Sequence, residues 1–278
     1  MLGWWWVAPV SCGLFGATLP VDAYIDRISV TSNEIRRTAF VHVPVGGPLG
    51  RSRPLWVVLH GSTYDDPARG RAAAARWIDA LNDDALFAFP EASSSADPEH
   101  PWHGPWGSHQ FRDLVFLRDL ITEIAEQHDV DTKRVYLVGH GEGARLASWA
   151  QCADPRRYAG FALVNGVAPD VVRERCDPTI RRPVIALFED PTRLEEPWHE
   201  WLLEGYHCTE SPVETPEATG PVNSRGQGRH HDCWTVPHVE IWTLGPSSHC
   251  VPRDAPPCDW VGPQVVRAYF ERFAGTGA

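Results

Sequence analysis

The stretch of sequence that decides the fold is Arg134-Val-Tyr-Leu-Val-Gly-His-Gly-Glu-Gly-Ala-Arg145. Residues 135–138 form a continuous apolar run, which is typical of a strand buried on both faces of a sheet. Residues 139–143 are Gly-His-Gly-Glu-Gly, and a helix is expected over residues 143–152. A buried strand that passes through a glycine-rich turn into a helix predicts an α/β architecture.

The turn has the spacing of a nucleophile elbow but lacks the nucleophile. In the pattern G-x-S-x-G, a strained turn between strand and helix exposes a serine hydroxyl above the sheet. Here the five positions hold Gly139, His140, Gly141, Glu142 and Gly143, so a glycine occupies the place of the serine. The sequence therefore predicts the backbone frame of an elbow without the oxygen atom that would attack an ester.

Strands and helices are predicted to alternate on both sides of this turn. The expected strands are residues 24–30, 38–43, 54–60, 85–89, 160–164, 183–188 and 239–243, and the other expected helices are 69–81, 111–128 and 265–273. This alternation predicts one domain over residues 23–278, built on a mostly parallel, doubly wound sheet with helices on both faces. Residues 209–232 are polar and rich in proline and glycine, and we expect a surface loop between Cys208 and Cys233.

The overall charge excludes two classes of partner. The formal net charge is −11 and the isoelectric point is about 5.6. Nucleic acids and anionic membrane surfaces both select basic patches, so neither is an expected partner. Some of the 13 tryptophans could line a cleft for aromatic or sugar-like ligands, although tryptophan is mainly core and interface material. We expect specificity to lie in the loops near Trp102 and Trp106 and in residues 209–232.

The cysteine count indicates an oxidising compartment. Cys12 lies in the apolar N-terminal stretch, which leaves an even set of six: Cys152, Cys176, Cys208, Cys233, Cys250 and Cys258. Six cysteines fit three disulfides. Zinc binding is the alternative, but this set contains no C-x-x-C or comparable ligand spacing.

Residues 1–22 are predicted to be a signal peptide or an apolar N-terminal segment. Residues 1–17 are apolar, rich in tryptophan and short for a membrane span. The basic n-region of a signal peptide is missing, and Pro9 argues against lipid attachment at Cys12. The expected location is extracellular or periplasmic, with no membrane contact after removal of the signal.

Several motifs in this order resemble one family. They are Pro-Leu-Trp-Val-Val-Leu-His-Gly at residues 54–61, Asp-Leu-Val-Phe-Leu at 113–117, the segment 134–139, and the pair Cys152 and Cys176. The chain resembles, over about residues 36–275, the poly(3-hydroxybutyrate) depolymerase and feruloyl esterase group of secreted α/β-hydrolases. The resemblance implies the α/β-hydrolase fold, a Cys152–Cys176 disulfide, secretion, no cofactor, and ester hydrolysis through a Ser-Asp/Glu-His triad.

The resemblance also assigns an oxyanion hole and a base. An oxyanion hole needs two N–H donors aimed at the developing negative charge. The matching backbone donors are those of Ser62, just after His60 and Gly61, and of Glu142, just after the elbow position. The base matches His249, in the loop after the last strand, where a disulfide between Cys250 and Cys258 would hold it.

The acid of the triad is the least certain assignment. The family has an aspartate shortly after the strand at residues 183–188. Counted without gaps, that aspartate falls on Thr192. Asp190 lies two positions earlier, and Glu195 or Glu196 would need a shift the other way. Asp190 is the residue that we assign.

No other side chain is expected to replace the missing serine. His140 and Glu142 flank the turn and are aimed elsewhere. Ser62 would collide with the oxyanion hole, and Ser148 lies about two turns into the helix. The histidines at 100, 103, 109, 230 and 231 show no established ligand spacing, so no metal is expected.

Three functions are consistent with Gly141. The first is a degenerate hydrolase that binds a small or polymeric ester, an aromatic acid or a glycan without cleaving it. The second is an active Ser-His-Asp esterase seen as a Ser→Gly variant. The third is a secreted domain that uses only the scaffold to bind a partner. The doubtful acid favours the first, because two departures from the triad are expected once selection for catalysis has ended.

Overall fold

The computed structural model describes residues 23–44, 51–61, 77–78, 85–93, 101–107, 109–166, 168–176, 181–188, 197–209, 213–219, 225–231, 233, 239–244 and 262–274. The predictions for residues 1–22, Ser62, Asp190, Thr192, Glu195, Glu196, His249, Cys250 and Cys258 lie outside these residues. Of the helix expected at residues 69–81, residues 77–78 are described and are helical.

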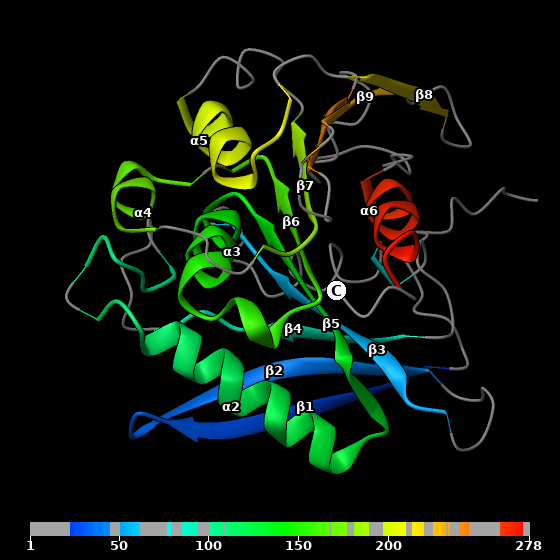
Figure 1. The fold of residues 1–278 in the computed structure, drawn as a ribbon. Coiled ribbons are helices and arrows are strands. Elements are labelled where there is room, and N and C mark those ends of the chain that lie inside the picture. The colour runs from blue at the N-terminus through cyan, green and yellow to red at the C-terminus, as the bar shows by residue number, and fades with distance from the viewer. Residues whose placement is uncertain are drawn as a thin grey trace, which may run out of the picture.

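The described strands form one mixed sheet (Figure 1). They are β1 Ala23–Ser32, β2 Ile35–Pro44, β3 Arg53–Leu59, β4 Leu86–Pro90, β5 Val130–His140, β6 Gly160–Val164, β7 Val184–Phe188, β8 Val213–Thr219, β9 Arg225–His231 and β10 Val239–Leu244. Their order across the sheet is β1-β2-β4-β3-β5-β6-β7-β10-β9-β8. The six central strands from β4 to β10 are parallel, and an antiparallel pair extends each edge.

Besides the helical residues 77–78, the α-helices within the described residues are α2 Arg112–Gln127, α3 Glu142–Ala153, α4 Asp170–Arg175, α5 Pro197–Tyr206 and α6 Gly262–Glu271. Figure 1 shows α2 and α3 on one side of the sheet and α6 on the other. The predicted mostly parallel sheet with helices on both faces is therefore confirmed. The sequence did not predict α4 and α5. No helix in the described segments is long and apolar enough to cross a membrane.

Alternate residues of the central strands pack into two hydrophobic cores. In β3, Leu55, Val57 and Leu59 belong to the core that includes α2 and α3. Trp56 and Val58 belong to the core that includes α6. A strand buried on both faces needs apolar residues at every position, which explains why the run at residues 54–59 shows no alternation.

The loop predicted for residues 209–232 is wrong. Residues 213–219 and 225–231 form the antiparallel strands β8 and β9, and β9 pairs with β10. Pairing at a sheet edge is made by backbone N–H and C=O groups, which polar residues also supply. Pro216, which cannot donate to the ladder, lies where the register shifts between Thr215 and Ala218. The polar composition therefore gave no sign of the hairpin at the sheet edge.

Two of the predicted disulfides are confirmed. Cys152, near the end of α3, is bonded to Cys176 just after α4, with Cα atoms 5.5 Å apart. Cys208, after α5, is bonded to Cys233. Each bond ties a helix to a segment about 25 residues away in the chain.

Replacing both Cys152 and Cys176 by serine is expected to lower the free energy of unfolding by about 3 kcal/mol. The unfolded chain regains the loop entropy that the bond removes over a separation of 24 residues. Urea unfolding followed by circular dichroism measures the change. The Cys208–Cys233 bond closes a loop of similar length, with a separation of 25 residues. The double variant Cys208→Ser, Cys233→Ser should therefore lose a similar amount of stability. Unchanged midpoints in both double variants would contradict this account.

Candidate active site

The chain turns from β5 into α3 within one residue. β5 ends at His140, α3 begins at Glu142, and Gly141 between them has φ 55° and ψ −116°. The Gly141 N–H donates to the carbonyl of Val164 in β6 at 2.8 Å, and the Gly141 carbonyl accepts from the Ala144 N–H at 3.0 Å. The elbow backbone is therefore fixed to the neighbouring strand on one side and to the helix on the other.

The three glycines of the turn differ in how much space they leave for a side chain. A Cβ on Gly139 would lie 2.3 Å from the Gly143 carbonyl oxygen, and one on Gly143 would lie 2.6 Å from the Leu59 carbonyl oxygen. These two positions exclude any side chain. A Cβ on Gly141 would meet only the Cα of Gly61, at 3.6 Å, which is an ordinary contact. The fold therefore leaves room for a side chain at residue 141, where a non-glycine residue in this conformation costs roughly 1–3 kcal/mol of backbone strain.

The start of α3 carries one of the two predicted oxyanion donors, the backbone N–H of Glu142. Glu142 is the first residue of α3, and N–H groups in the first turn of a helix have no intrahelical acceptor. The aligned peptide dipoles add positive potential there, which favours a bound or developing anion. Gly61, the residue before Ser62, approaches Gly141. The Glu142 carboxylate accepts from the Arg145 guanidinium at 2.8 and 3.0 Å.

The ring of His60 positions the chain just before Ser62. Its Nε2 accepts the Ala92 N–H at 3.3 Å, so the ring proton belongs on Nδ1, which donates to the Gly61 carbonyl at 3.0 Å. The His60 carbonyl accepts from the Trp102 indole N–H at 2.8 Å. These bonds hold the turn after β3 against the segments that follow β4.

The two tryptophans near the site have structural roles. Trp102 is only 1% exposed, and its carbonyl accepts from the Trp106 indole N–H at 3.2 Å. The Arg145 guanidinium lies 4.8 Å from the centre of the Trp106 ring. The Trp102 side chain is therefore core material, and the prediction that the loops near it set specificity stays a prediction. Sequence reasoning missed the contact of Arg145 with Trp106, because residues 39 positions apart carry no pattern.

Other candidate nucleophiles and metal ligands are occupied elsewhere. Burial lowers the pKa of His140 to about 4, so its ring is neutral and a poor base at neutral pH. Ser148 is buried and donates to the Ala144 carbonyl at 2.9 Å, as expected for a packed helix residue. His103 and His231 contact Asp113 and the Thr209 carbonyl, at 3.3 and 3.1 Å. Within the described segments no three or more His, Cys, Asp or Glu side chains form a group that could hold a metal.

Asp113 anchors the loop that carries these tryptophans. It is fully buried, pairs with the buried Arg37 at 2.6 Å, and accepts the His103 N–H at 2.5 Å. Burial alone would raise the pKa of Asp113, but the His103 hydrogen bonds and the Arg37 charge outweigh it and lower this pKa below 3.8. The family-like segment at residues 113–117 thus begins with a structural ion pair.

The strands that lead to the predicted base and acid end beside the elbow. His140 pairs with Val164, Val164 with Leu187, and Leu187 with Trp242, so β5, β6, β7 and β10 finish at one edge of the sheet. β7 ends two residues before Asp190, and β10 ends five residues before His249. Loops at the carboxyl edge of parallel strands are where such folds place their sites. His249 and Asp190 themselves remain predictions.

The sheet order and the elbow define the class: the chain has the α/β-hydrolase fold. Its sequence is similar to that of "Putative esterase NocK" from Nocardia uniformis subsp. tsuyamanensis, with 30% identity over 160 residues, 55% of this chain and 44% of that protein. The match thus spans less than half of that relative. No protein-family model matches the chain.

Solved esterase and hydrolase structures share the fold. A ferulic acid esterase is 13% identical with a TM-score of 0.52, covering 66% of this chain and 86% of its own. The "Putative Dienelactone Hydrolase" of Klebsiella pneumoniae subsp. pneumoniae MGH 78578 is 16% identical with a TM-score of 0.51, covering 66% of this chain and 81% of its own. At these identities the similarity establishes the fold.

Replacing Asp113 by asparagine is expected to lower the free energy of unfolding at pH 7 by about 3 kcal/mol, because Arg37 is left as a buried charge without its partner. The pKa of Asp113 is lower in the folded state, so its contribution is complete above the unfolded pKa near 4 and is lost as the pH falls through the folded value. The difference between native and variant proteins should therefore shrink at pH 3. Urea unfolding at both pH values measures it.

The matched control for this prediction is Asp170→Asn. The Asp170 side chain is 83% exposed, so its ion pair with Arg173 contributes little. An Asp113→Asn protein as stable at pH 7 as the Asp170→Asn protein would show that the buried pair does not hold the loop.

Proposed function

We propose that the protein is a secreted, degenerate α/β-hydrolase of the poly(3-hydroxybutyrate) depolymerase and feruloyl esterase type. It binds an ester, an aromatic acid or a glycan at the carboxyl edge of the sheet and does not cleave it. The observation that carries the proposal is Gly141, which occupies the elbow position in an elbow conformation but provides no nucleophilic atom.

The chemistry of the missing serine explains the loss of turnover. In a complete triad the serine oxygen attacks the carbonyl carbon, histidine takes the serine proton, and the acid holds the imidazole. Without the oxygen no acyl-enzyme forms, and water is the only remaining attacking group. Removing the serine of subtilisin lowers kcat by on the order of 10⁶-fold, which gives the scale of the effect.

The other parts of the proposed site are inferred from the resemblance and the strand ends. Ser62 and Glu142 supply the oxyanion N–H donors, His249 is the base, and Asp190 is the acid. The helix start at Glu142 and the approach of Gly61 to the elbow support the first pair. The ends of β7 and β10 beside β5 support the second.

The class of ligand and the location rest on separate support. The related proteins carry the names of an esterase and a ferulic acid esterase, which favours ester or aromatic acid ligands. Two disulfides favour an oxidising compartment, extracellular or periplasmic.

A second candidate function is an active ester hydrolase in which residue 141 is serine. One observation favours it: the backbone at Gly141 has the positive φ of an elbow, and a Cβ there would make only an ordinary contact. The two candidates share the same proposed site and differ in the side chain at residue 141.

The decisive variant is Gly141→Ser, assayed beside the native protein with p-nitrophenyl acetate and methyl ferulate. We expect background hydrolysis by the native protein and turnover by the serine variant, because the new hydroxyl completes the triad. The activity should disappear in Gly141→Ser combined with His249→Ala. Calorimetry of the native protein with methyl ferulate should show binding without product.

The matched control is Gly107→Ser, which adds the same hydroxyl where a Cβ would meet nothing within 4 Å. It should remain inactive. Hydrolysis by the native protein above background would contradict the degenerate proposal. An inactive but folded Gly141→Ser variant would show that His249 and Asp190 do not form a latent triad.

A further inference from the structure

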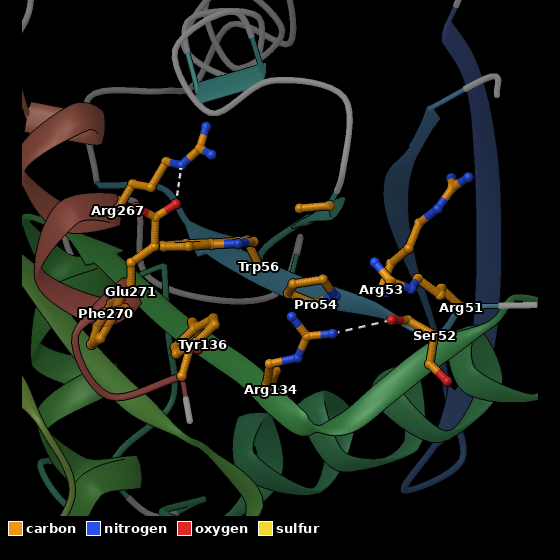
Figure 2. Close-up of a pocket in the computed structure, with 12 residues that line it drawn as sticks. Arg51, Ser52, Arg53, Pro54, Trp56, Arg134, Tyr136, Arg267, Phe270 and Glu271 are labelled. Atoms are coloured by element: carbon orange, nitrogen blue, oxygen red, sulfur yellow. Dashed lines mark hydrogen bonds and ion pairs between the residues drawn. The ribbon is translucent and has the colours of Figure 1, made fainter. Parts of the chain in front are cut away.

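A cavity lies near the start of β3, away from the ends of β3 and β5 where the elbow is found. It has a volume of about 280 Å³ and is lined where β3 begins, at the middle of β5 and along α6 (Figure 2). Arg53 and Arg134 line it, whereas His60 and Gly141 follow the far ends of the same two strands. The cavity is therefore separate from the candidate active site, and what it binds does not depend on the function proposed for that site.

The rim of the cavity is cationic. Arg51, Arg53, Arg134 and Arg267 line it, with Glu271 as the acidic residue among them. The chain as a whole has a net charge of −11, so four arginines around one small cavity are a local reversal of sign. Guanidinium groups bind carboxylates and phosphates by paired, charge-assisted hydrogen bonds.

Three of these arginines have bonds that fix their places. Arg134 donates to the Asp131 carboxylate at 2.7 Å and to the Ser52 carbonyl at 3.1 Å. Arg267 pairs with Glu271 at 2.5 Å, as Figure 2 shows, and Arg53 donates to the Pro44 carbonyl at 2.9 Å.

Arg51 differs from the other three. It makes no hydrogen bond or ion pair with any residue in the described part of the chain. Its guanidinium is the group best placed to take a ligand.

The floor of the cavity is aromatic. The ring centres of Trp56 and Tyr136 are 4.8 Å apart, those of Tyr136 and Phe270 are 4.6 Å apart, and those of Trp56 and Phe270 are 5.6 Å apart. Figure 2 shows these rings together on one side, with Arg134 beside Tyr136. Such a cluster accepts the flat, apolar part of a ligand.

Two polar atoms of this floor have no protein partner. Trp56 and Tyr136 are each 5% exposed, and neither the indole N–H nor the phenol hydroxyl bonds to any residue that the structure describes. Neither atom is among the fully buried side-chain atoms that lack a partner, so both are accessible from the cavity that their residues line. Burial, as the main cause, raises the pKa of Tyr136, so its hydroxyl keeps its proton and can donate.

We propose that this cavity binds a small organic anion, a carboxylate or phosphate carried on a flat apolar group. The unpartnered groups are the Arg51 guanidinium, the Trp56 N–H and the Tyr136 O–H, all of which donate hydrogen bonds. A set of donors selects a ligand that only accepts, and the cationic rim selects one that is negatively charged. The aromatic floor selects the apolar body, and the volume, near the lower end of the range for ligand pockets, limits its size.

Calorimetric titration of the full chain tests the chemistry with four probes: benzoate, phenyl phosphate, inorganic phosphate and benzyl alcohol. Benzoate or phenyl phosphate should bind, more weakly at higher salt, and the tighter of the two identifies the preferred oxyanion. Benzyl alcohol has the ring without the charge, and inorganic phosphate has the charge without the ring. Each should bind roughly tenfold or more weakly than the aromatic anion. The proposal would be overturned if benzyl alcohol or inorganic phosphate bound as tightly as the aromatic anion. It would also be overturned if neither benzoate nor phenyl phosphate bound.

Variants locate the binding. Arg51→Gln and Tyr136→Phe each remove a group without a protein partner, so both proteins should keep the native Tm while losing roughly tenfold in affinity. Arg36→Gln makes the same charge change at an exposed residue of β2 outside the cavity and should bind as the native protein does. Gly141→Ser should also leave the affinity unchanged, which separates this cavity from the elbow. Unaltered affinity in both cavity variants would overturn the assignment.

Discussion

The close approach of α3 to β3 and β5 is the constraint on which the rest of this site depends. The first turn of α3 lies so near the end of β3 that a Cβ on Gly143 would be 2.6 Å from the Leu59 carbonyl, and one on Gly139 would be 2.3 Å from the Gly143 carbonyl. Two residues without side chains permit this contact. It places the start of a helix, with its positive potential, beside the turn after β3. The elbow is therefore a consequence of backbone packing around Gly139 and Gly143.

That packing lets the elbow backbone form with glycine at residue 141. Gly139 and Gly143 are required by the close contacts of the turn. Gly141 is not required in this way, because a side chain there has room and only backbone strain opposes it. A serine at residue 141 would supply a hydroxyl group but would have to adopt this strained backbone conformation. A basic cavity with an aromatic floor lies near the start of β3. A ligand-binding role for the protein therefore does not depend on the elbow alone.

The sequence predicted the parts of the fold that are set by local pattern. The buried runs at residues 54–59 and 135–138, the glycine-rich turn, and the Cys152–Cys176 and Cys208–Cys233 pairs all appear as expected. The β8–β9 hairpin was missed, because pairing at a sheet edge uses backbone groups that leave no apolar signature. At the turn, the elbow position of Gly141 was predicted from the spacing of the glycines. The contacts of Trp102 with His60 and of Arg145 with Trp106 join residues 42 and 39 positions apart in the chain, and no local pattern encodes them.

The central claim is that the elbow backbone is intact and that the nucleophilic side chain is missing. Intact-mass spectrometry after treatment with a fluorophosphonate tests it most directly, because this reagent bonds covalently to a serine that an adjacent base activates. The account predicts no adduct on the native protein and one adduct per chain on Gly141→Ser, mapped by peptide sequencing to residue 141. An adduct on the native protein would reveal a nucleophile elsewhere, and a folded Gly141→Ser protein without an adduct would show that the rest of the site is lost. Either result would contradict the account.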